Sequence, residues 1–225
     1  MRKNISAVDA IVRRRSVRQF LSTPVPEALV LEILNIASRA PSGTNIQPWT
    51  VHVVTGNARE RVSLAVSEQA LTGKRCPEYA YLPEQMVEPH ISRRRKLGYE
   101  LYRLYGIERN DMEGRKWAEI RNFNFFGAPV GMFFVMDRYL TQGSWLDCGM
   151  FMQNVMIAAQ DFGLETCPQQ AWCDYGEIVH ASLHIPPSQI IVSGMAMGYV
   201  DESASVNLLK SERIDANEFA VIHRT

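Results

Sequence analysis

Residues 145–162 constrain the fold more than any other segment of the chain. The segment is apolar nearly all round, and it is followed by Gly163, a residue type that commonly ends helices in the left-handed conformation. A helix without a polar face has to be covered by protein on several sides. The sequence therefore predicts a helix that is either central in the fold or placed at a contact between subunits.

Shorter segments around this helix predict a mixture of strands and further helices. The predicted strands are residues 50–55, 129–136 and 190–200, and the predicted helices begin after Ser6, at Pro26 and at about Arg59. Residues 73–124 differ from the rest in holding a run of four basic residues, several tyrosines and scattered prolines, which indicates a helical insertion. Without internal repeats or a linker, residues 1–225 are predicted to form one domain with an inserted helical segment.

Composition excludes several classes of protein. The chain has 24 Lys and Arg against 24 Asp and Glu, whereas a dedicated nucleic-acid binder needs an excess of positive charge. No apolar run approaches the ~20 residues that span a bilayer, and the first six residues lack the apolar stretch of a secretory signal. The four cysteines show no C-x-x-C spacing, so we expect reduced thiols in a cytoplasmic protein.

Two basic clusters predict an anion site. The first is Arg14-Arg15-Ser16-Val17-Arg18, where guanidinium groups and a hydroxyl follow a predicted helix and could clamp a phosphate. A solvated helix terminus is the alternative for this segment taken alone. The second cluster, Lys210-Ser211-Glu212-Arg213, follows the last predicted strand, and two separated clusters on a neutral chain favour the anion site.

Two polar segments predict contacts with a flat ligand. Residues 41–48 (Pro-Ser-Gly-Thr-Asn-Ile-Gln-Pro) form a loop that offers neutral donors and acceptors, which suit the carbonyl and NH edges of a heteroaromatic ring. A well-capped connection between a helix and a strand is the alternative. Residues 166–171 (Thr-Cys-Pro-Gln-Gln-Ala) can present backbone NH groups to a ligand edge, although this pattern is weak alone.

Other catalytic patterns are missing. His180 and His184 have the spacing of zinc ligands on a helix, but no glutamate follows the first histidine, so no metal site is expected. There is no G-x-S-x-G elbow, no Walker loop and no G-x-G-x-x-G after a strand. Cys148 has apolar neighbours and is expected to be a packing residue. The sequence therefore shows none of these catalytic signatures.

The basic opening and the polar loop together resemble the nitroreductase family. Residues 14–20 resemble its R-R-S-x-R-x-F opening, and residues 41–49 resemble its P-S-x-x-N-x-Q-P-W loop at the expected distance. Gly127-Ala128-Pro129, the long helix ending before Gly163 and the basic tail follow in the same order. The resemblance covers the chain except for about 73–124, and it is strongest to the bacterial branch that acts on nitroaromatics such as nitrobenzoate.

This resemblance implies a nitroreductase-like α+β fold, in which helices flank a mixed central sheet, and an intertwined homodimer with FMN at the subunit interface. Arg14, Arg15, Ser16 and Arg18 would hold the phosphate and ribityl chain, with Lys210 and Arg213. Pro41, Ser42, Asn45 and Gln47 would reach the flavin from the other subunit. Gln170 and Ala171 would lie near the flavin N5, and Pro168 would be a further cofactor-binding residue. Many relatives have Glu-Gly where this chain has Gln170-Ala171, so a backbone role survives and an acidic side-chain role does not.

The implied activity is a ping-pong reaction. NADH or NADPH would give a hydride to FMN, and an electron-poor acceptor would then bind in the same place, a nitro group becoming nitroso and then hydroxylamine. No side chain is assigned as catalytic with certainty, and Thr44 is a hypothesis for the acceptor pocket. The insertion at about 73–124 would cover the active site and set substrate choice through aromatic residues and a basic residue such as Arg121. The residues that could cover the flavin are Tyr99, Tyr102, Tyr105, Phe123, Asn124 and Phe125. The alternative is that they pack the insertion onto the body of the protein.

Several alternatives remain open at this point. Quinone, enone or flavin reductases, dehalogenases and flavin destructases share the family, and a flavin-binding protein without turnover is a different class. Asn45 and Ser16 favour a reductase over the flavin destructase, and Leu104 stands where the dehalogenating relatives have the tyrosine of a Glu-x-x-x-Tyr pair. The choice between NADH and NADPH and the physiological acceptor are not indicated by the sequence.

Overall fold

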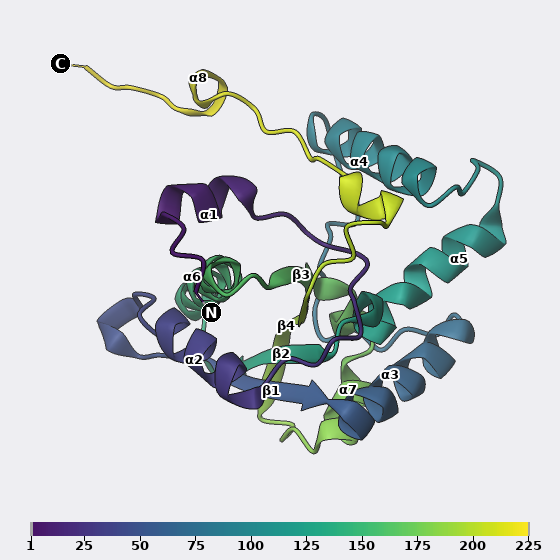
Figure 1. Ribbon diagram of the computed structural model, residues 1–225, viewed down its shortest axis with the longest axis horizontal. Helices are drawn as coiled ribbons and strands as arrows, with labels where there is room; N and C mark the ends of the chain where they lie inside the picture. Colours follow the sequence, from purple (N-terminus) through teal and green to yellow (C-terminus); the bar gives the residue numbers. More distant parts are fainter. Residues whose placement is uncertain (1, 225) are drawn as a thin grey trace.

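One four-stranded sheet organises the molecule, and the computed structural model describes residues 2–224. The strands are β1 (Thr50–Thr55), β2 (Val130–Asp137), β3 (Glu165–Gln169) and β4 (Gln189–Gly198). Their order in the sheet is β1-β2-β4-β3, so β1 and β3 form its two edges (Figure 1). The three strands predicted from β-branched and apolar content are confirmed, and β3 overlaps the polar segment 166–171, where no strand was predicted.

The mixed sheet expected from the resemblance is wrong for the described residues. All three strand pairs, β1 with β2, β2 with β4 and β4 with β3, run antiparallel. A mixed sheet needs a parallel strand, and the edges β1 and β3 are the two places where one could be added. Within residues 2–224, the parallel pairing at β3 is a single bridge between Ser16 and Thr166, which is too short to form a strand.

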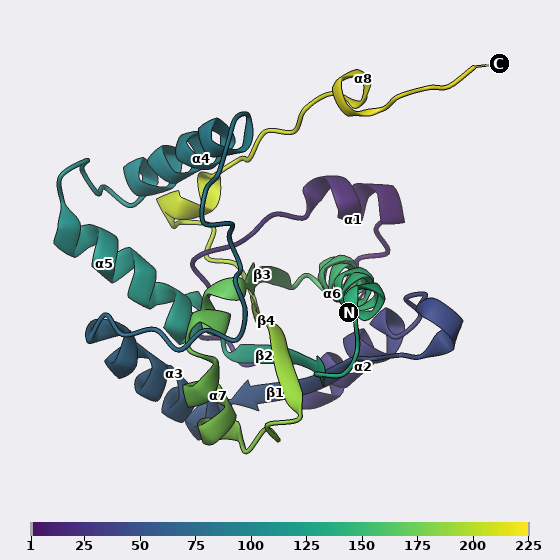
Figure 2. The same ribbon diagram turned by 180° about the vertical axis from the view of Figure 1, so that it is seen from behind.

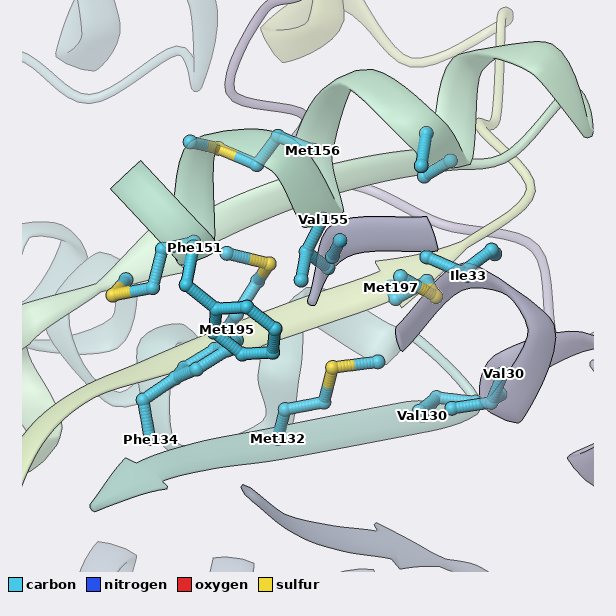
Figure 3. Packing of buried hydrophobic residues seen from close by; sticks show 14 of the residues in the cluster. Val30, Ile33, Val130, Met132, Phe134, Phe151, Val155, Met156, Met195 and Met197 are labelled. Carbon is cyan, nitrogen blue, oxygen red and sulfur yellow. The ribbon is translucent and has the colours of Figure 1, made fainter. Parts of the chain in front are cut away.

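Two helices cover one face of the sheet. α2 (Glu27–Ala37) and α6 (Gln142–Asp161) pack on each other and on β2 and β4. Met132, Phe134, Met195 and Val155 belong to this core, where side chains from α6 point toward the strands (Figure 3). The predicted central helix is thus confirmed, although it begins three residues earlier, at Gln142. Gly163 follows it with a φ of 72°, as expected for a helix-ending glycine.

The opposite face is covered by α3 (Gly56–Leu71), α7 (Gly176–Leu183) and the 3-10 segments η2 (Arg121–Gly127) and η3 (Gln170–Asp174). Phe125 and Trp172 stack at 4.5 Å between ring centroids. Gly131 and Gly194 make room for them, because an added Cβ would come within 2.3 Å of either ring. Phe123 and Phe125 are fully buried here, so the expectation that they cover the flavin is wrong and the alternative of packing onto the body holds.

The predicted insertion contains α4 (His90–Leu104) and α5 (Met112–Ile120). α4 packs against η4 (Ser205–Leu208), and the ammonium group of Lys96 lies 2.7 Å from the carboxylate of Glu212. The structure therefore places the insertion beside the segment that follows the last strand, as the views from both sides show (Figures 1 and 2).

The N-terminal helix packs on the body, whereas the C-terminal tail leaves it (Figure 1). α1 (Ala7–Arg13) begins after Ser6, whose hydroxyl accepts from the Asp9 N–H, as predicted. It packs on α6, while the segment with α8 (Ala216–Phe219) extends past α1 and away from the body (Figure 1). This tail exposes three apolar side chains, those of Phe219, Val221 and Ile222. None of the helices in residues 2–224 combines the length and the apolar character needed to cross a membrane.

Candidate functional site

A cavity of about 1240 Å³ lies between α1, the C-terminal half of α6, the first residues of β3 and residues 209–213. Six of the predicted cofactor-binding residues line it, and they are Arg14, Arg15, Ser16, Pro168, Lys210 and Arg213. The structure therefore brings together the two basic clusters that are almost 200 residues apart in the sequence.

The cavity is strongly basic. Lys3 and Arg13 add two more cations to its wall, whereas Glu165 is its single carboxylate. Among the salt bridges of residues 2–224, none involves Arg14 or Lys210. Cations without a carboxylate partner are available for charge-assisted hydrogen bonds to a bound anion. The arrangement fits a phosphate group.

Local structure fixes where the first cluster points. Arg13 ends α1 and Arg14 caps it, so the chain leaves the helix at the cavity wall. The next residues run beside β3, where Ser16 bridges Thr166 and the Val17 N–H donates to the Thr166 carbonyl at 3.1 Å. This pairing holds the basic opening against the edge strand.

Arg18 and Arg121 make hydrogen bonds within the chain. Arg18 does not line the cavity, and its guanidinium donates to the Ser16 carbonyl at 3.1 Å. Arg121 donates to the Arg18 carbonyl at 2.9 Å and lies over the Trp117 ring. A substrate carboxylate would have to compete with these contacts, so Arg121 is a structural residue here. It ties the insertion to the basic opening.

Glu165 is a cavity residue that the sequence reasoning missed. Gln160 on α6 donates to its carboxylate at 2.6 Å. Burial raises the pKa of Glu165 above its usual value, while the Gln160 hydrogen bond and the charge of Arg15 act in the opposite direction. The available signal was its position directly before the polar segment 166–171.

The polar loop 41–48 contacts α6 at a different place from the cavity. None of its residues lines the cavity, whereas the Gly43 N–H lies 3.3 Å from the carboxylate of Asp147 on α6. The cavity touches α6 from Gln153 to Gln160. Gln153 and Gln160 follow Asp147 by six and thirteen residues, which is about 9 to 20 Å along a helix axis. One chain therefore presents the loop and the cavity at different parts of α6.

The loop has an unusual backbone. Thr44, Asn45 and Gln47 have φ values of 49°, 62° and 48°, in the left-handed region that residues with a side chain rarely adopt. Their side chains are exposed, as is Pro41, and Ser42 is half-buried. Strained backbone of this kind clusters at ligand-binding and catalytic sites.

The structure places the residues of the polar segment 166–171 in two different surroundings. Pro168 lines the cavity, but Gln170 and Ala171 begin η3 and do not. The neighbouring Gln169 is buried and its amide donates to the Asn122 carbonyl at 2.7 Å, which ties the end of β3 to η2. Gln170 and Ala171 are half-buried beside this contact.

No side chain near the cavity is prepared for nucleophilic chemistry. All four cysteines are free, and burial raises the pKa of Cys148 to about 11 and that of Cys173 to about 12. Thiols with such values stay protonated at neutral pH. His180 contacts Glu78 and the Ile185 carbonyl, and residues 2–224 contain no group of three potential metal ligands. The site can bind and orient an anionic ligand.

Comparisons with known proteins agree with this geometry. A model of the nitroreductase family matches residues 11–199. The chain is 41% identical to the chloronitrobenzene nitroreductase of Comamonas testosteroni over 216 residues, covering 94% of this chain and 95% of that protein. It is 42% identical to the 4-nitrobenzoate reductase of Pseudomonas putida over 212 residues, covering 94% and 93%.

A solved structure is similar over nearly the whole fold. The FMN and NADPH-dependent nitroreductase NfnB from Sphigopyxis sp. strain HMH superposes with a TM-score of 0.96 at 40% identity, covering 98% of this chain and 100% of that chain. The family match, the identities and the fold lead to one conclusion. This chain belongs to the nitroreductase family.

Proposed function

We propose that the chain is an FMN-dependent oxidoreductase that uses NAD(P)H to reduce nitroaromatic compounds. The observation that carries the proposal is the basic cavity, in which two distant clusters of predicted phosphate-binding residues meet. The family membership and the activities of the similar proteins from Comamonas testosteroni and Pseudomonas putida support it. The NADPH dependence of the similar NfnB protein supports a nicotinamide donor.

The residues present fit the phosphate end of FMN. Arg14, Arg15 and Lys210 would bind the phosphate, and the Ser16 hydroxyl would donate or accept at the same end of the ligand. Glu165 accepts from Gln160 and has a second oxygen that could accept from a ribityl hydroxyl. The cavity volume of about 1240 Å³ exceeds what a mononucleotide needs, so room remains for the partner contacts described below.

When bound, FMN would supply hydride transfer from NAD(P)H to the nitro group. The chain's own residues then have to bind, orient and shield the flavin, because the buried thiols are protonated at neutral pH. Gln170 and Ala171 would contribute backbone N–H groups near the ring, as the family resemblance implies. Thr44 would lie at the acceptor side.

The active form would be an intertwined homodimer. Val8, Val12 and Leu146 are each more than two-thirds exposed on α1 and α6, and the tail adds exposed apolar residues of its own. Exposed apolar patches of this kind usually mark contact surfaces. A second copy would also complete the site, because the loop 41–48 of one chain could then face the cavity of the other. Two FMN molecules would bind per dimer.

The insertion at about 73–124 would cover the active site and select the acceptor. α4 is fastened to the segment after β4 by the Lys96–Glu212 ion pair and by a hydrogen bond from the Ser205 hydroxyl to the Leu104 carbonyl at 2.8 Å. That segment continues directly into Lys210 and Arg213 at the cavity. Substitutions in α4 that leave these two contacts intact are expected to change acceptor preference more than flavin binding.

An anaerobic visible spectrum tests the proposed function. The purified protein should show oxidised flavin that bleaches when NADH or NADPH is added and regains colour when a nitrobenzoate is added. A coloured protein that neither donor bleaches would indicate a flavin-binding protein without turnover. A colourless protein that cannot be reconstituted with FMN would contradict the proposal.

A further inference from the structure

The loop 41–48 is fastened to α6 at both ends. At its start, both carboxylate oxygens of Asp147 lie 3.3 Å from the Gly43 N–H. Just after its end, the Trp49 ring stacks on the Phe151 ring at 4.6 Å between centroids, with 4° between the planes. Asp147 and Phe151 are four residues apart, so they share one face of the helix.

Asp147 is an unusual residue for a helix interior. Its side chain is 6% exposed, and within residues 2–224 the Gly43 N–H is the single donor that its carboxylate meets. A buried carboxylate is costly unless hydrogen bonds offset the loss of water. Two long contacts to one donor offset little of that loss. An acceptor at this buried position is therefore better explained by its contact with the Gly43 N–H than by stability alone.

Phe151 anchors the other end of the loop in the core. It is 2% exposed and packs between Phe134 of β2 and the Trp49 ring. Figure 3 shows its ring pointing from α6 toward the strands, close to Met195. The Trp49 stack thereby connects the end of the loop to the hydrophobic core.

The loop needs such anchors because its conformation is strained. Thr44, Asn45 and Gln47 all have positive φ, and their side chains are exposed. Hydrogen bonds inside the loop help, as from the Gln47 N–H to the Ser42 hydroxyl at 3.0 Å. They fix the turn itself, but they do not fix where the turn sits on the protein.

We propose that Asp147 and Phe151 are positioning residues that hold the loop 41–48 in the shape and place required to contact the flavin. Asp147 acts through the Gly43 N–H at one end, and Phe151 acts through Trp49 at the other. The inference rests on the proposed function, in which Asn45 and Gln47 reach the flavin. It adds two residues that do not touch the cofactor themselves but control those that do.

The test compares FMN affinity and stability across matched variants of the full-length protein. Asp147→Ala removes the acceptor, and Asp147→Asn keeps one oxygen that can accept from Gly43. Val155→Ala is the control, because Val155 is a buried α6 residue in the same core that lies eight residues beyond Asp147. FMN dissociation constants come from flavin fluorescence, and thermal unfolding of the apoprotein reports the damage to the fold.

We expect Asp147→Ala to weaken FMN binding at least about tenfold, and Asp147→Asn to stay within about threefold of the unchanged protein. Val155→Ala should lower the unfolding temperature without a comparable loss of FMN affinity. The circular dichroism of the bound flavin should change in Asp147→Ala alone. Unchanged affinity in Asp147→Ala, or an equal loss in Val155→Ala, would overturn the proposal.

A second pair of variants tests the contact from the loop side. Gly43→Pro removes the N–H at the first position of a 3-10 turn, where proline is tolerated, and Gly43→Ala keeps the N–H. An added Cβ there would lie 4.0 Å from the Asp147 carboxylate, which is an ordinary contact. Gly43→Pro should weaken FMN binding as much as Asp147→Ala does. The double variant should lose no more FMN affinity than either single variant, because both changes remove the same contact.

These variants keep the two proposals separate. If the protein without any substitution binds no FMN, the proposed function is wrong. An unchanged protein that binds FMN, with Asp147→Ala and Gly43→Pro binding equally well, would remove the positioning role alone. If Asp147→Ala fails to fold, the Gly43→Pro and Gly43→Ala pair decides the question.

Discussion

The basic cavity and the polar loop are two binding surfaces built in opposite ways. The cavity gathers charged side chains from residues 3–16, 165–168 and 209–213, and its shape depends on the whole fold. The loop is eight consecutive residues, neutral and mostly exposed, and its shape depends on local backbone strain. A phosphate needs charge collected from several directions, whereas a heteroaromatic edge needs a few donors at fixed positions.

Helix α6 is the element that the two surfaces share. Gln153, Met156 and Gln160 in its C-terminal half line the cavity, while Asp147 and Phe151 in its N-terminal half hold the loop. Because one helix supports both, their spacing within one chain is fixed. The family resemblance, and not this spacing, is the reason for proposing that the loop serves the cavity of a second copy.

The largest effect is expected at the cavity. Arg14→Ala combined with Lys210→Ala removes two cations that have no carboxylate partner among the described residues, so the phosphate loses two charge-assisted contacts. We expect FMN affinity to fall at least about a hundredfold, which leaves the purified protein colourless. The absorbance ratio of flavin to protein measures it. Stoichiometric FMN in the double variant would contradict the anion site.

A smaller effect is expected at the loop. Asn45→Ala combined with Gln47→Ala removes neutral hydrogen-bonding groups, so we expect a loss of about tenfold in FMN affinity. The dependence on salt should distinguish the surfaces, because salt screens the cavity charges and hardly affects neutral contacts. The loop variant should keep the salt dependence of the unchanged protein, and titrations from low to high salt measure it. A weaker salt dependence of FMN affinity in the loop variant would contradict the claim that the loop contributes only neutral contacts.

Glu165 gives the cavity a pH dependence that the loop lacks. Burial raises its pKa, so as pH falls through that raised value the carboxylate becomes neutral and stops repelling the phosphate. Glu165→Gln imitates the neutral form. We expect it to bind FMN more tightly than the unchanged protein by a few-fold above that pH and equally well below it. The pH profile of FMN affinity for both proteins measures the difference, and parallel profiles would exclude the role of Glu165.

The smallest effect is expected from relieving strain in the loop. Thr44 has a φ of 49°, so Thr44→Gly should stabilise the fold by about 0.5 kcal/mol, as relief of strain outweighs the added flexibility of the unfolded chain. Thr44→Ala keeps a Cβ and should not stabilise. Urea unfolding of the two apoproteins measures the difference. Equal stability of the glycine and alanine variants would show that the loop is not strained at this residue.

The loop was predictable because its polar, proline-rich residues are consecutive, and α6 was predictable because its apolar character is continuous. The basic clusters were visible in the sequence, but their meeting in one cavity depends on tertiary structure. Glu165 was missed because its place before the polar segment 166–171 is a weak signal, and Asp147 because a single acidic residue in an apolar helix carries no pattern. Their roles come from Gln160 and Gly43, which lie five and 104 residues away.

Strand pairing and aromatic burial were harder to predict for similar reasons. Alternating or apolar runs indicate that a strand exists, but they do not give its direction, so the antiparallel sheet could not be deduced. Phe123 and Phe125 have the composition of a ligand-covering segment, yet they fill the core next to Trp172. The Phe125 ring fits because Gly131 has no side chain at that point of β2. A single glycine in an apolar strand gives no sequence pattern that would predict this contact.

The measurement that tests the central claim most directly is a complementation experiment with mixed dimers. One chain carries Arg14→Ala and Lys210→Ala, the other carries Asn45→Ala and Gln47→Ala, and two different tags allow the mixed dimer to be purified. If each flavin site combines the cavity of one chain with the loop of the other, one site of the mixed dimer is intact. The account predicts one FMN per dimer, bound with the affinity of the unchanged protein. A mixed dimer without any site of that affinity would show that cavity and loop serve the flavin within one chain, and would contradict the account.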